Sequence, residues 1–126
     1  MDMDVVVWLC GVHSLAFALF HLGFWKLFDW PRDLRGTSVA TRAVTQILNL
    51  RLIYVFFAVA AACFFLPDDL LDTTLGRCLL GAMSLFWVGR LIEQAIFLRF
   101  NKTMLHVLSV LFALGAVLFA WPLLVR

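Results

Sequence analysis

Four long apolar segments dominate this sequence and restrict what it can fold into. They cover residues 4–26, 45–66, 75–98 and 103–125. Each has about 20 or more residues, and a helix rising ~1.5 Å per residue is then long enough to cross the ~30 Å hydrocarbon layer of a membrane. A helix pairs its own backbone groups, whereas no segment shows the alternation typical of a membrane β-strand. The sequence therefore predicts an all-α integral membrane protein with four transmembrane helices.

The composition agrees with lipid as the surrounding solvent. Of the 126 residues, 64% are hydrophobic and only 14% are charged, and the mean hydropathy is +1.00. A soluble domain is about half apolar and about a quarter charged, and a small domain cannot hide such an apolar surplus in its core. The net charge of +2 gives no argument for a nucleic acid as partner. We expect the lipid bilayer as partner and a single domain over residues 1–126.

The charged residues separate by the connection that they flank. Basic residues surround the first and third connections, namely Lys26, Arg32, Arg35, Arg42 and Arg51 at the first and Arg90, Arg99 and Lys102 at the third. The opposite helix ends carry Asp2, Asp4, Asp68, Asp69 and Asp72, with only Arg77 and Arg126 as basic residues. Because basic loops stay in the cytoplasm, both termini are predicted on the non-cytoplasmic side. Short connections make consecutive helices antiparallel neighbours, so we expect an antiparallel bundle in the cell (inner) membrane.

The helix starts carry recognisable signals. Asp2 and Asp4 precede the first segment, which is also too long for a signal peptide, so we expect it to be retained as a helix. Thr37 or Ser38 is the expected N-cap of the second helix, which should begin within the polar stretch 38–46 before it enters lipid. Asp72 or Thr73 is expected to cap the third helix.

Polar side chains fall at a similar depth in all four predicted helices. The stretch GRLIEQ brings three of them to the cytoplasmic third of the third segment, and the complete set is Arg90, Glu93, Gln94, His21, Gln46, Asn49 and His106. At ~100° per residue, the polar residues of a helix share one face. Ionisable groups in a membrane face the bundle interior and mark functional sites. We therefore predict a site at this level that binds or transports a proton, an ion or a small ligand.

The third segment suggests how its charges are tolerated. Glu93 is the single glutamate of the chain, and Arg90 precedes it by one helical turn, at the spacing of an ion pair. Trp87 shares the face and is placed to lie over the Arg90 guanidinium in a cation–π contact. The sequence alone leaves the protonation state of Glu93 open.

Two alternatives remain open at this stage. His21 and His106 come from different helices at similar depth, so they could ligate a haem or a metal in a membrane enzyme or redox subunit. The sequence has no H-E-x-x-H, E-x-x-H or C-x-x-C spacing, so no metal ligand, cofactor or catalytic residue is assigned. Alternatively, the polar residues only hold helices together, within this chain, in a homodimer or in a larger membrane complex.

Overall fold

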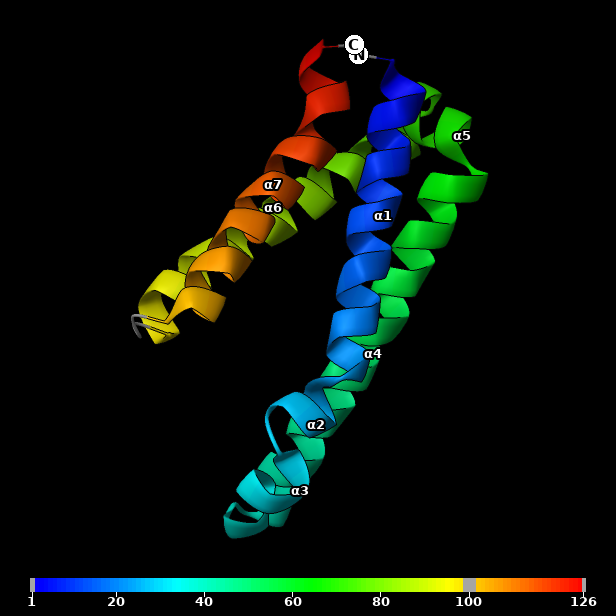
Figure 1. Ribbon diagram of the computed structural model, residues 1–126. Helices are drawn as coiled ribbons and strands as arrows, with labels where there is room; N and C mark the ends of the chain where they lie inside the picture. The colour runs from blue at the N-terminus through cyan, green and yellow to red at the C-terminus, as the bar shows by residue number, and fades with distance from the viewer. Residues whose placement is uncertain (1, 99–101, 126) are drawn as a thin grey trace. The chain divides into compact units, whose positions relative to one another are not determined.

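The computed structural model describes residues 2–98 and 102–125. Within these ranges the chain is helical and has no strand. Four helices are long and apolar enough to cross a membrane, namely α1 (Met3–Leu22), α4 (Val39–Phe65), α6 (Thr74–Phe97) and α7 (Thr103–Val125) (Figure 1). This confirms the prediction of an all-helical chain with four helices of spanning length. Arg99 and Arg126, used above in the charge argument, lie outside the described residues.

The chain divides into two compact units. One comprises residues 11–61, with most of α1 and α4 and the short helices α2 (Phe24–Leu27), α3 (Trp30–Asp33) and η1 (Leu34–Gly36). The other comprises residues 1–10 and 62–126, with α5 (Pro67–Asp72), α6, α7 and the ends of α1 and α4. We call them the α1–α4 unit and the α6–α7 unit. That all 126 residues form one domain stays a prediction.

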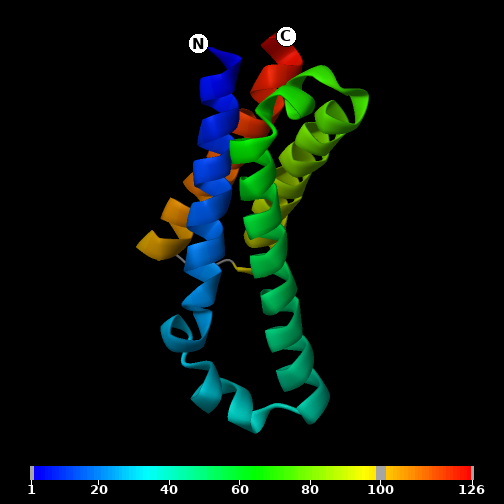
Figure 2. The same cartoon turned by 90° about the vertical axis from the view of Figure 1, so that its right-hand side faces the viewer.

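The α1–α4 unit is an antiparallel helical hairpin. Phe17 of α1 contacts Phe56 of α4, with ring centroids 6.1 Å apart. One turn further along α1, His21 contacts Asn49, which lies earlier in α4. The partner number falls as the number in α1 rises, so the two helices run in opposite directions (Figure 2). Phe17, Phe56 and Asn49 are buried.

The first long helix ends earlier than predicted. The expected span reached residue 26, whereas α1 ends at Leu22 and Gly23 begins a separate turn, α2. Glycine is about 1 kcal/mol less favourable than alanine inside a helix, so it is a natural break. Asp29 follows α2 in the left-handed conformation with φ of 50°, and Pro31 lies in the first turn of α3. The connection is therefore a series of short helical turns.

Both predicted caps are confirmed. The Thr41 amide donates to Ser38 Oγ over 3.1 Å, and α4 begins at Val39, ahead of the predicted span at residue 45. The Gly76 amide likewise donates to Thr73 Oγ1 over 2.9 Å at the start of α6. The Thr73 hydroxyl in turn donates to the Asp69 carbonyl, which ties α5 to α6. The α5 turn was predicted only as a connection.

The α6–α7 unit is a second antiparallel hairpin. Ser84 Oγ donates to the Ala116 carbonyl over 2.7 Å, and Gln94 Nε2 donates to the Leu105 carbonyl over 3.1 Å. The two pairs have nearly the same sum of residue numbers, as antiparallel helices require. Its buried apolar core is contributed by both helices and includes Leu80, Met83, Trp87, Phe112 and Phe119.

Large apolar side chains cover the outside of the helices. Leu75 is 82% exposed, Phe65 is 81% exposed and Leu124 is 79% exposed, and many further leucines, valines and isoleucines are exposed. A water-soluble monomer rarely exposes wide contiguous apolar surface, which marks membrane or protein contact. Exposure on this scale, together with four helices of spanning length, identifies a multi-pass membrane protein.

Gly76 gives a test of the α5–α6 junction. A Cβ atom at this position would overlap the backbone of Asp69 and Leu70. We expect Gly76→Ala to destabilise the protein by about 1–3 kcal/mol, as overpacking does, measured by SDS-induced unfolding in mixed micelles. Gly89→Ala in the same helix is the control, because its added Cβ would have no atom within 4 Å beyond its chain neighbours and the nearby backbone of its own helix. Equal unfolding midpoints for the two variants would contradict this close approach.

Candidate functional site

Two of the predicted site residues pair across the α1–α4 hairpin. His21 Nδ1 lies 2.7 Å from Asn49 Oδ1, and Asn49 Nδ2 donates to the His21 carbonyl over 3.0 Å. The amide oxygen can only accept, so Nδ1 carries the proton of this bond. The His21 ring also lies against Phe24, with centroids 4.1 Å apart. A metal or haem iron at His21 would therefore have to bind Nε2.

A second pair lies one helical turn away in the same unit. Trp25 Nε1 donates to Gln46 Oε1 over 2.9 Å, and Gln46 Nε2 donates to the Arg42 carbonyl over 3.0 Å. Both ends of the Gln46 amide are thus bonded, as are both ends of the Asn49 amide. These two amides join the hairpin, and their polar atoms are already bonded to protein groups.

Arg90 of α6 contacts an aromatic ring that the sequence did not indicate. Its guanidinium carbon lies 4.7 Å from the centroid of Phe112 in α7, a cation–π distance. Trp87 was expected beneath the guanidinium, but it stacks on Phe112, with centroids 5.5 Å apart and planes at 20°. The cation is therefore held across the hairpin, over a Phe112 ring that Trp87 supports.

Glu93 does not complete the expected ion pair. Among residues 2–98 and 102–125, the structure has no Arg90–Glu93 contact within ion-pair distance, and the ion pair that it does record joins Arg32 to Asp29 at 3.9 Å. Glu93 is exposed, whereas its neighbour Gln94 is 3% exposed. The spacing places the two charges on neighbouring turns, but the guanidinium lies over the Phe112 ring on the α7 side.

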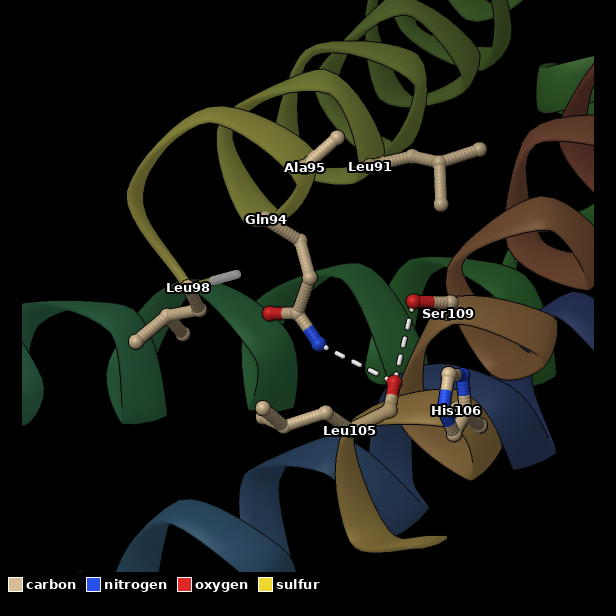
Figure 3. Close-up of a pocket in the computed structure, with 7 residues that line it drawn as sticks. All are labelled: Leu91, Gln94, Ala95, Leu98, Leu105, His106 and Ser109. Atoms are coloured by element: carbon tan, nitrogen blue, oxygen red, sulfur yellow. Dashed lines mark hydrogen bonds between the residues drawn. The ribbon is translucent and has the colours of Figure 1, made fainter. Parts of the chain in front are cut away.

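A pocket lies between α6 and α7 close to the end of the hairpin that joins them. It has a volume of about 290 Å³ and is lined by Leu91, Gln94, Ala95, Leu98, Leu105, His106 and Ser109 (Figure 3). All seven belong to the α6–α7 unit. Two predicted site residues, Gln94 and His106, therefore line one pocket, and Ser109 joins them from the face of α7 that carries His106.

The Gln94 amide is fixed in one orientation. Nε2 donates to the Leu105 carbonyl, which also accepts from Ser109 Oγ over 2.9 Å. A carbonyl oxygen can only accept, so the amide nitrogen must face it and Oε1 must turn to the other side (Figure 3). This Oε1 atom is buried and has no hydrogen-bond partner among the described residues. It is an unpartnered acceptor on a residue that lines the pocket.

The predicted seven residues thus take different positions. His21, Asn49 and Gln46 belong to the α1–α4 unit, and Arg90, Glu93, Gln94 and His106 belong to the α6–α7 unit. Whether they share one layer stays a prediction. Sequence reasoning missed Trp25 and Phe112. Trp25 could have been found from the spacing. It lies four residues after His21, and Gln46 lies three residues before Asn49. In an antiparallel pair, one turn forward along one chain segment meets one turn backward along the other.

Among the described residues, no three His, Cys, Asp or Glu side chains lie close enough together to hold a metal ion. Ligation of a haem by His21 and His106 from separate helices stays a prediction.

Comparison with known proteins gave no relative. No protein-family model, no curated protein and no solved structure matches this chain.

The His21–Asn49 contact gives a test of the hairpin. We expect Asn49→Leu to lower the free energy of unfolding by about 1–2 kcal/mol, because it removes two interhelical bonds and leaves buried polar atoms behind. Thr45→Val is the matched control in the same helix. It removes a hydrogen bond of 2.7 Å to the carbonyl of Thr41 in its own helix. If the two variants unfold at the same SDS fraction, the contact does not stabilise the hairpin.

Proposed function

We propose that this protein is a small multi-pass membrane protein that binds a small ligand in the pocket between α6 and α7. The buried Gln94 Oε1 carries this proposal. Leaving a buried acceptor without a partner costs about 1–3 kcal/mol, and its pocket has room for a molecule. A ligand that donates a hydrogen bond to Oε1 would remove that cost on binding.

The two hairpins support different roles for their polar residues. In the α1–α4 unit, the amides of Asn49 and Gln46 bond through both ends to protein groups. In the α6–α7 unit, the Gln94 amide uses only its nitrogen. A glutamine at a similar predicted depth is therefore bonded at both ends of its amide in one hairpin and only at the nitrogen in the other. We place the binding site at Gln94 because its amide oxygen can still accept a hydrogen bond.

The proposed setting is an antiparallel four-helix bundle in the cell (inner) membrane with both termini on the non-cytoplasmic side. Exposed basic residues of the first connection, such as Lys26, Arg32 and Arg35, support this orientation, as do the exposed aspartates of α5. The pocket lies toward the connection between α6 and α7, so it would open toward the cytoplasmic half. A role in transport would require this site to be reached from both sides.

The topology can be tested with reporter fusions. Alkaline phosphatase at either terminus is expected to be active, and a fluorescent protein there is expected to be dark, because both ends would be outside the cytoplasm. An insertion of each reporter at Gly36, in the first connection, should give the reverse pattern. A cytoplasmic signal from either terminus would overturn the orientation.

Ligand binding can be tested on the protein as purified. Mass spectrometry of a solvent extract should find a small molecule retained by the wild-type chain. We expect Gln94→Leu to lower its recovery about fivefold or more, the equivalent of about 1 kcal/mol or more. Ser84→Ala is the matched control, because it also removes an α6–α7 hydrogen bond but lies outside the pocket. Equal recovery from all three proteins would contradict the proposal.

A structural role is the second candidate function. The His21–Asn49 and Trp25–Gln46 contacts favour it, since interhelical polar contacts of this kind hold membrane bundles together. In that case the protein would serve as a membrane-embedded partner in a homodimer or a larger complex. The Gln94→Leu variant separates the two candidates. If it loses stability but retains as much of the small molecule as the wild-type chain, the structural role is favoured.

A further inference from the structure

The pocket between α6 and α7 has a buried hydrogen-bond acceptor, Gln94 Oε1, that has no partner among the described residues. Gln94 Nε2 and the Ser109 hydroxyl both donate to the Leu105 carbonyl. Gln94 Oε1 has no partner among the described residues, and the Ser109 oxygen keeps its lone pairs. Both groups can therefore accept a hydrogen bond from a ligand. A ligand that fits them must bring the hydrogen-bond donor itself.

The lining also restricts the charge of the ligand. None of the seven lining residues is Asp, Glu, Lys or Arg. Glu93 is the residue before Gln94 in α6, but it does not line the pocket. An ammonium or a carboxylate brought into apolar surroundings without a counter-charge carries a large desolvation cost. The pocket therefore favours a neutral donor over a charged one.

The volume of the pocket and its apolar lining restrict the class of ligand further. The volume of about 290 Å³ is well above the ~150 Å³ of an apolar protein cavity that holds benzene. Leu91, Ala95, Leu98 and Leu105 supply apolar contact, and the spans around the pocket have the length and hydropathy of membrane helices. A compound that partitions into lipid and carries a small polar head matches these walls.

We propose that the pocket takes the hydroxyl end of a neutral, lipid-soluble alcohol or phenol, with the hydroxyl donating to Gln94 Oε1. This inference rests on the proposed function and names the chemical class of its ligand. The hydroxyl supplies the donor that Oε1 lacks, carries no charge and leaves its apolar body against the leucines. Ser109 Oγ offers a second acceptor from α7.

Three photoreactive probes with the same dodecyl tail and a diazirine group test this class. They are the alcohol, its methyl ether and the primary ammonium, each added to the full chain in lipid nanodiscs. Labelled residues are mapped by mass spectrometry, and unlabelled dodecanol competes for the site. We expect saturable labelling of the pocket residues by the alcohol, at least about fivefold stronger than by the ether, which cannot donate.

Variants link the labelling to the Gln94 oxygen. Gln94→Leu should reduce labelling by the alcohol about fivefold or more, whereas Ser84→Ala should retain it. Gln94→Glu keeps an acceptor and adds a negative charge. We expect it to prefer the ammonium probe over the alcohol, a reversal that a merely structural role for Gln94 would not produce. It also provides a readout if Gln94→Leu fails to fold.

The possible outcomes separate the two proposals. If no probe labels the pocket in a saturable way, ligand binding itself fails, and this inference fails with it. If the ether labels as well as the alcohol, or the ammonium labels the wild-type chain better, the pocket binds ligands but the hydroxyl class is wrong. An unchanged probe preference in Gln94→Glu would also overturn the hydroxyl assignment.

Discussion

Inside hydrocarbon, a polar side chain has no water to bond with, so its partners must come from the protein or from a ligand. Both hairpins of this chain are organised by that requirement. Asn49 bonds to His21 of α1 with both ends of its amide. Gln46 accepts from Trp25 across the hairpin and donates to the Arg42 carbonyl of its own helix. Arg90 of the other hairpin lies over the Phe112 ring of α7. Polar groups in an otherwise apolar chain thus mark where one helix meets the next.

The helices themselves could be predicted from the sequence, because spanning length and helix caps are local properties. The predicted span at 103–125 matches α7, and Ser38 and Thr73 cap their helices as expected. The early end of α1 follows from Gly23, a local signal that the apolar run obscured. Such features depend on a few neighbouring residues, so one sequence is enough to find them.

The partners of the polar residues could not be predicted in the same way. Helical phase shows which residues share a face, but it does not say which helix that face meets. Arg90 was therefore assigned to Glu93 and Trp87 of its own helix, whereas its aromatic contact is Phe112 of α7. The exposure of Glu93 beside the buried Gln94 also depends on the rotation of α6 against α7. Side-chain contacts between helices need the register of the hairpin, which the sequence does not give directly.

Gln94 combines both roles of the polar residues, since its amide nitrogen joins α6 to α7, and its amide oxygen is an unpartnered acceptor on a residue that lines the pocket. A high-resolution structure of the full chain in lipid nanodiscs tests this most directly. We expect non-protein density in the pocket at hydrogen-bond distance, about 2.7–3.2 Å, from Gln94 Oε1. A closed pocket in which Oε1 accepts from a protein group would contradict it.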